Sequence, residues 1–208
     1  MNKMLFAAAV CVVLTSVAGS AFAAKKTAGK AKAPSTPGKS FSVYSDQGAK
    51  SNHFVPSGWM GDCGDIKLNA GFKEGPQAGT SCIMITYSAE SSQNNGWSGV
   101  YWQYPANNWG NVNKGYNLTG VKKLTFWARG EKGDEEIAEF KVGGISGEYA
   151  DSDSTTVGPV KLTKEWKQYT IDLDGKDLSH VIGGFCWTAS KDNNPEGVVF
   201  YLDEIAFE

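Results

Sequence analysis

Residues 123–129 read KLTFWAR, and they carry the clearest strand pattern in the chain. Leu124, Phe126 and Ala128 alternate with other side chains, so an extended segment here has one apolar face. Similar runs, separated by turns rich in Gly, Asn and Asp, occur at 81–87, 98–104, 139–142, 156–162, 166–173, 184–188 and 198–207. About eight strands without an amphipathic helix of three turns predict an all-β, two-sheet antiparallel β-sandwich of the jelly-roll type over residues 40–208.

The 39 residues before this domain differ from it in composition. Residues 1–23 combine Lys3, an apolar stretch over 5–17 and the sequence Ala21-Phe22-Ala23, which is typical of a signal peptide cleaved after Ala23. Residues 24–39 hold five Lys and no acid, and we predict a disordered linker because they cannot bury enough apolar surface. We therefore expect a secreted protein, extracellular or periplasmic, without membrane insertion, since no later stretch is long and apolar enough.

Charge and residue usage exclude several classes of function for residues 40–208. This part holds 14 basic and 22 acidic side chains, a formal net charge of −8. Nucleic-acid binding needs clustered positive charge, so we expect no nucleic-acid partner. The chain has two His, His53 and His180, and no Cys-x-x-Cys, which disfavours a zinc or redox site.

Three cysteines remain after the predicted cleavage, and an oxidising compartment favours pairing. We predict a disulfide between Cys63 and Cys82, because Cys63 precedes a loop and Cys82 opens a strand. Closing a loop of this length is worth about 3 kcal/mol in the loop-entropy account. Cys186 lies between Phe185 and Trp187, and we expect it to be a buried free thiol.

The aromatic content is the main functional signal. Seven Trp and eight Tyr exceed what a core of this size needs. The rings can stack on the apolar C–H face of a pyranose, while fixed polar groups bind its hydroxyls. Arg129, the one Arg of the chain, offers a planar fork of donors. Tyr101 and Trp102 must point to opposite faces, and the pattern does not say which of the two is inward.

We predict that a polysaccharide or oligosaccharide binds through exposed aromatic side chains. Trp127, Arg129, Trp109, Trp187 and either Trp102 or Tyr101 are expected to converge on one face. The predicted carbohydrate-binding residues are Tyr101, Trp102, Gln103, Trp109, Trp127, Arg129, Glu139, Lys141 and Trp187.

Four segments occur in an order that resembles a known group of proteins: WSGVYWQ (97–103), LTFWARGE (124–131), WKQYTIDL (166–173) and FYLDEI (200–205). They are similar to carbohydrate-binding modules of the galactose-binding-like β-jelly-roll superfold, and the likeness covers about residues 80–208. The resemblance implies sugar binding on the concave sheet or at the loop tips. It also implies a structural Ca²⁺ held by Asp203, with Asp46, Asp62 and Asp65 as candidates for the remaining oxygen ligands.

Two other functions stay open. A secreted glycoside hydrolase or polysaccharide lyase can have a jelly-roll fold, and a glycosidase needs two facing carboxylates about 5 to 10 Å apart. Glu139 is a candidate for one of them, but no catalytic motif is present, so the sequence favours binding over catalysis. The third possibility is a cell-surface structural or adhesive protein that binds another protein. A cell-surface or secreted enzyme is a further candidate partner.

Overall fold

The computed structural model describes residues 40–208, so the predicted signal peptide (1–23) and linker (24–39) lie outside the described residues. Strands make up the regular structure of this part, apart from η1 (Cys63–Asp65), a single 3-10 turn. The strands are β1 (Phe41–Tyr44), β2 (Val55–Gly61), β3 (Ile66–Phe72), β4 (Cys82–Tyr87), β5 (Trp97–Gln103), β6 (Lys123–Gly130), β7 (Glu136–Ile137), β8 (Glu139–Gly143), β9 (Ser154–Val157), β10 (Val160–Lys161), β11 (Lys167–Asp172), β12 (Gly183–Ser190) and β13 (Val198–Phe207). Among residues 40–208 there is no helix with the length and apolar character needed to cross a bilayer.

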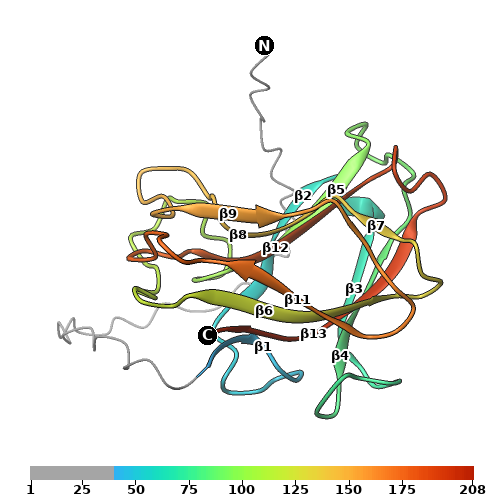
Figure 1. Ribbon diagram of the computed structural model, residues 1–208. Helices are drawn as coiled ribbons and strands as arrows, with labels where there is room; N and C mark the ends of the chain where they lie inside the picture. The colour runs from blue at the N-terminus through green and yellow to red at the C-terminus, as the bar shows by residue number, and fades with distance from the viewer. Residues whose placement is uncertain (1–39) are drawn as a thin grey trace, which may run out of the picture.

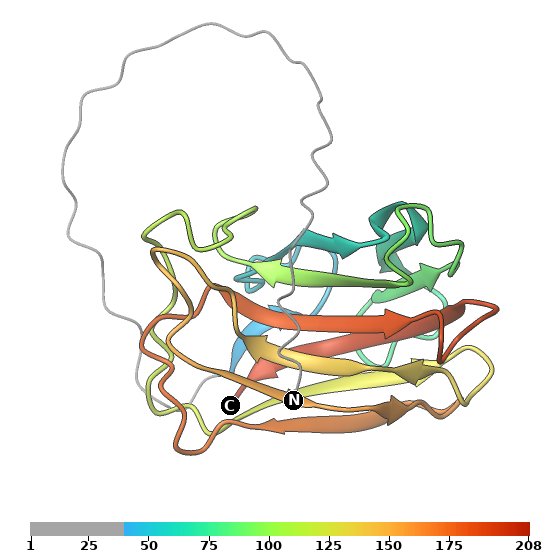
Figure 2. The same ribbon diagram turned by 90° about the horizontal axis from the view of Figure 1, so that it is seen from above.

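Two antiparallel sheets lie face to face (Figure 1). The six-stranded sheet has the order β11-β6-β13-β4-β3, and β1 also pairs with β13. The five-stranded sheet has the order β2-β5-β12-β8-β9, and Figure 2 shows β2, β5 and β12 side by side in it. A short pair of β7 and β10 completes the structure. The predicted all-β antiparallel sandwich is confirmed.

The core forms where aromatic side chains from the two sheets meet. Leu124, Phe126 and Ala128 of β6 are fully buried, as the alternation in 123–129 predicts. The ring centroid of Phe126 lies 4.6 Å from that of Phe140 and 5.1 Å from that of Phe185, both on the five-stranded sheet. These contacts bury large apolar areas and fix the spacing and the relative position of the sheets.

Two further aromatic residues of the five-stranded sheet complete this layer. Trp187 of β12 meets Phe200 of β13 edge to face, with ring centroids 5.1 Å apart. Trp102 of β5 packs in the same way against Phe185, at 5.7 Å. Both tryptophan rings are therefore core components that the sandwich needs for its packing.

The strand pattern in the sequence misses some elements and merges others. β3 has the alternation Ile66-x-Leu68-x-Ala70, a strand signal that the sequence analysis did not use. In β2 the strand pattern is interrupted by Pro56 and Gly58, so it could not be recognised. The predicted strand 156–162 is wrong as one element, because Gly158 and Pro159 separate β9 from β10. Proline has no N–H for the ladder, so the chain leaves β8 there and pairs again with β7.

The predicted Cys63–Cys82 disulfide is wrong. Cys82 is a buried free thiol. Cys186 is also buried and free, as the sequence predicted. In the β3–β4 hairpin Phe72 pairs with Cys82 at one end and Ile66 pairs with Tyr87 at the other, next to Cys63. At about 3.3 Å per residue the two ends lie about 17 Å apart, far beyond the 7 Å or so that a disulfide spans between Cα atoms.

Replacing Phe126 by Ala should lower the free energy of unfolding by about 3 to 5 kcal/mol, because the substitution opens a cavity between the two sheets. Thr170→Ala, at an exposed position on the neighbouring β11, is the matched control and should change it by less than about 0.5 kcal/mol. Urea unfolding followed by Trp fluorescence measures both. Equal effects of the two substitutions would show that the inter-sheet aromatic cluster does not stabilise the domain.

Candidate functional site

The structure divides the nine predicted carbohydrate-binding residues among three places. Trp102 and Trp187 are buried in the core, with at most 1% of their surface exposed, so the prediction that they bind sugar is wrong. On β5 the inward positions are Val100 and Trp102, which places Tyr101 on the outer face. The predicted alternation of side chains along the strands was correct. The sequence did not show which of the two alternating sets of residues faces the core.

Trp127 and Arg129 lie on the outer face of the six-stranded sheet. The Arg129 guanidinium carbon is 3.7 Å from the centre of the Tyr201 ring and 5.3 Å from the Trp166 ring. The hydroxyl of Tyr201 donates to Glu131 at 2.5 Å. Arg129 is therefore held by cation–π contacts on one side of the sandwich, and the predicted convergence of all these residues on a single face is wrong.

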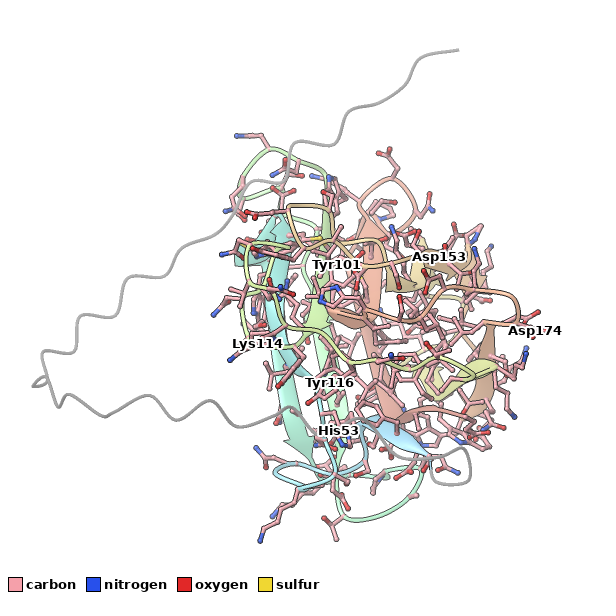
Figure 3. All side chains as sticks on the ribbon, turned by 90° about the vertical axis from the view of Figure 1, so that its left-hand side faces the viewer. His53, Tyr101, Lys114, Tyr116, Asp153 and Asp174 are labelled. Atoms are coloured by element: carbon pink, nitrogen blue, oxygen red, sulfur yellow. The ribbon has the colours of Figure 1, made fainter. Side chains whose placement is uncertain are left out.

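The other five predicted residues share the outer face of the five-stranded sheet, where two loops cover part of them. Tyr101 is 5% exposed, and its hydroxyl donates to the carbonyl of Gly143 at 3.0 Å. Trp109 meets Tyr101 edge to face with ring centroids 6.1 Å apart. Figure 3 looks at this end of the sandwich and labels Tyr101 beside the loops that leave β5 and β8. Gln103, Glu139 and Lys141 complete this group of five.

The two covering loops, 104–115 and 144–153, touch each other above the sheet. The N–H of Tyr149 donates to the carbonyl of Gly110 at 2.9 Å. A Cβ atom on Gly110 would lie 2.4 Å from the carbonyl oxygen of Ser146, so the close approach requires glycine there. The carboxylate of Asp151 holds the second loop on the sheet by accepting from the N–H groups of Ile145 and Ile182. The pair of loops forms a fixed wall along one side of the open face.

Beyond this wall a row of four residues runs across the strands, and we call it the central row: Met60, Gly99, Thr188 and Glu139. Cross-strand pairing sets Met60 opposite Gly99, Gly99 opposite Thr188, and Thr188 opposite Glu139. Gly99 is buried, and a Cβ atom there would lie 2.6 Å from the carbonyl oxygen of Trp187, 2.8 Å from the side chain of Thr188 and 3.1 Å from that of Met60. The neighbouring side chains therefore close over the middle of the row, and the partly exposed residues Met60, Thr188 and Glu139 form its surface.

Trp97 stands next to the central row, and sequence reasoning did not include it among the binding residues. It is half-buried and pairs with Ser190 at the end of β5. A usable signal was present, because Trp97, Gly99 and Tyr101 have the same parity along the strand and so share one face. The central row thus has Trp97 on one side and the loop wall with Trp109 on the other.

The position of Trp97 depends on Asp62, which the resemblance placed in a calcium site. The fully buried carboxylate of Asp62 accepts from the N–H groups of Gln93, Asn95 and Gly96 at 2.7 to 3.0 Å. Its own N–H donates to the carbonyl of Trp97 at 2.8 Å. Burial opposes ionisation of Asp62, but the donors from Asn95, Gln93 and Gly96 outweigh it and keep the pKa below its usual value. Asp62 therefore orders the turn that precedes Trp97.

The other three predicted calcium ligands also bind backbone donors. Asp65 accepts from Ser91 and Ser92, Asp46 from Thr80 and Ser81, and Asp203 from Gln77 and Ala78. Among residues 40–208 no three His, Cys, Asp or Glu side chains gather so as to hold a metal ion. The donor set does not fit a shared Ca²⁺, because N–H groups fill the positions that a cation needs free. Calcium binding remains a prediction of the sequence.

Asp203 is nevertheless electrostatically unusual. Its side chain is fully buried at the outer side of β13. Burial raises its pKa from 3.8 to about 6, and the N–H bonds from Ala78 and Gln77 only partly offset that effect. The protonated form is thus favoured in the folded state at mildly acidic pH.

The comparisons with known proteins place this architecture in a class. No model of a known protein family matches the sequence, and no curated protein matches it either. Among solved structures, the chain shares the jelly-roll fold of carbohydrate-binding modules.

Three of these structures illustrate the likeness. A family 30 carbohydrate-binding module of a cellulosomal cellulase of Clostridium thermocellum superposes with a TM-score of 0.55 at 13% identity, over 82% of this chain and 97% of that module. Another crystal structure of a family 30 module gives a TM-score of 0.56 at 13% identity, over 82% and 98% of the two chains. The family 11 module of a second cellulosomal cellulase of Clostridium thermocellum gives 0.50 at 13% identity, over 83% and 95%. At this identity the likeness shows the fold.

The raised pKa of Asp203 predicts a pH dependence of stability. A carboxyl group whose folded pKa exceeds its unfolded pKa contributes stability that is full below about pH 4 and is lost as the pH rises through about 6. The free energy of unfolding of the natural protein minus that of Asp203→Asn should therefore fall by about 2 to 3 kcal/mol between pH 4 and 7. Urea unfolding at several pH values measures the difference. A difference for Asp203→Asn that stays flat between pH 4 and 7 would contradict the assignment.

Proposed function

We propose that this protein is a secreted, non-catalytic carbohydrate-binding domain, and that a neutral polysaccharide chain lies across the strands along the central row. The observation that carries the proposal is the half-buried Trp97 beside the partly exposed residues of the central row, on the outer face of the five-stranded sheet. The C–H face of a pyranose ring can stack on an indole while neighbouring polar groups bind its hydroxyls. The shared fold of carbohydrate-binding modules supports this function without specifying the sugar.

Polar side chains along the same row supply partners for sugar hydroxyls. Glu139 accepts a hydrogen bond from the hydroxyl of Thr156 at 3.1 Å, which orients its carboxylate on the outer face of β8. Lys141 and Thr188 are partly exposed on this face. A set of two charged groups and two hydroxyls around an apolar ring can fix the orientation of a hydroxylated ligand.

The electrostatic balance favours a neutral ligand. Residues 40–208 carry a formal net charge of −8, which opposes the approach of a polyuronate. The central row also crosses β2, β5, β12 and β8, as suits an extended chain that lies across several strands. The signal sequence predicted at 1–23 supports secretion, where such polysaccharides occur.

Trp97→Ala should weaken binding to a neutral β-glucan oligosaccharide by at least about tenfold, since buried aromatic contacts dominate binding energies. Trp127→Ala is the matched control, because Trp127 is equally half-buried but lies on the opposite sheet, and it should leave the Kd unchanged. Isothermal titration of the chain from residue 24, after a first screen on a polysaccharide panel, measures both.

Equal losses for both variants would reject the central row as the binding surface. Release of reducing sugar would make the protein a glycosidase. No retention on any glycan in the panel would favour the alternative of a surface protein that binds another protein.

A further inference from the structure

Arg129 lies on the outer face of the six-stranded sheet without an acidic partner. Its guanidinium carbon is 3.7 Å from the centre of the Tyr201 ring and 5.3 Å from that of the Trp166 ring. The two rings are inclined at 69° to each other, with centroids 6.5 Å apart. None of the ion pairs found among residues 40–208 includes Arg129. Aromatic rings, and not a carboxylate, therefore hold the one Arg of this chain in place.

The contact with the rings leaves hydrogen-bond donors of Arg129 available. Stacking uses the flat face of a guanidinium, whereas its N–H groups point outward from the edge. Arg129 is partly exposed, and its nitrogens are not among the buried atoms of residues 40–208 that lack a partner, so water reaches these donors. The carboxylate of Glu131 accepts from the hydroxyl at the end of the Tyr201 ring, while the guanidinium lies over the ring centre. A planar fork of donors is thus open to an anion with two oxygens.

Two further side chains lie near this fork along the border of the sheet. Trp166 is partly exposed, and its Nε1 donates to the carbonyl of Gly75 at 3.0 Å, which fixes the indole beside the guanidinium. Gln168 is two residues further along the chain, so it points to the same side, and it is exposed. β11 is the edge strand of the sheet, with β6 as its neighbour (Figure 1). A ligand can therefore approach this group from the open border.

We infer that Arg129, Trp166 and Gln168, which we call the Arg129 site, bind a single uronic acid unit carried by an otherwise neutral polysaccharide. The carboxylate of the unit accepts two parallel hydrogen bonds from the guanidinium. The C–H face of its ring stacks on the indole, and the amide binds a hydroxyl. The choice of a saccharide rests on the proposed function, whereas the requirement for a carboxylate rests on Arg129 alone.

The charge of the domain limits the ligand to a sparsely charged chain. A formal net charge of −8 over residues 40–208 repels a dense polyuronate but has little effect on a chain with one carboxylate. Interactions between exposed charges are screened beyond about 8 Å at physiological salt, whereas the contact of a guanidinium with a carboxylate acts at hydrogen-bond distance. The Arg129 site and the central row lie on different sheets, so they bind separate segments of polysaccharide.

The test compares two pentasaccharides that differ only in one carboxylate. The first is β-1,4-xylotetraose with one α-linked glucuronic acid, and the second is its carboxyl-reduced form, in which that unit is glucose. The acidic form should shift backbone NMR resonances of residues 128–130 and 166–168 in the chain from residue 24, and added salt should weaken its binding. The carboxyl-reduced form should leave these resonances unchanged.

Three variants locate the interaction. Arg129→Lys keeps a cation over the Tyr201 ring but lacks the planar fork, and it should raise the Kd for the acidic pentasaccharide about tenfold. Gln168→Ala changes an exposed position, so the fold is preserved, and it should raise this Kd about threefold by removing one hydrogen bond. Thr170→Ala, at the next outward position of β11, is the matched control and should leave the Kd unchanged.

Equal binding of both pentasaccharides, an unchanged Kd for Arg129→Lys, or shifts absent from 128–130 and 166–168 would overturn the inference. Binding of tetraglutamate to these residues as tight as that of the acidic pentasaccharide would also overturn it, by making the Arg129 site one for acidic peptides. A neutral glucose tetramer tests the central row in the same experiment. Failure of that site shows as missing shifts around residues 97–99, independently of the Arg129 site.

Discussion

The contact between aromatic rings of the two sheets is the constraint on which the rest of the structure depends. Phe126 packs on Phe140 and Phe185, and Trp187 packs on Phe200, so these contacts together fix which residues of β6, β8, β12 and β13 face the core. Because side chains alternate along a strand, fixing the inward residues also determines every outward residue. The candidate site is a consequence of that choice.

The outward faces of the two sheets differ chemically. On the six-stranded sheet, Arg129 covers the ring of Tyr201 in a cation–π contact. On the five-stranded sheet, Trp97 stands beside the central row, whose partly exposed side chains include Thr188 and Glu139. On the six-stranded face a cation thus covers an aromatic ring, whereas on the five-stranded face an indole adjoins polar side chains that can bind hydroxyl groups. This difference is the reason for placing a neutral glycan on the five-stranded sheet and not on its partner.

Carboxylate side chains have three different roles in this domain. Four aspartates accept hydrogen bonds from backbone N–H groups and thereby order turns: Asp46, Asp62, Asp65 and Asp203. Residue type alone cannot distinguish this role from the binding of a metal ion. Glu139 is held by a hydroxyl on an open face. Glu135 is buried, with an oxygen that lacks a donor. Identical side chains thus differ in function because neighbours from distant parts of the chain differ.

The sequence by itself determined the all-β antiparallel sandwich, seven of the main strands and the free, buried state of Cys186, because period-two alternation and turn residues are local signals. It also identified residues that do lie on the five-stranded face, such as Tyr101 and Glu139. Only the tertiary structure decided that Trp102 and Trp187 fill the core, that Cys63 and Cys82 lie at opposite ends of a hairpin, and that Trp97 adjoins the central row. The sequence shows which residues of a strand share one face, because side chains alternate. Packing against the opposite sheet decides which of the two faces becomes the core.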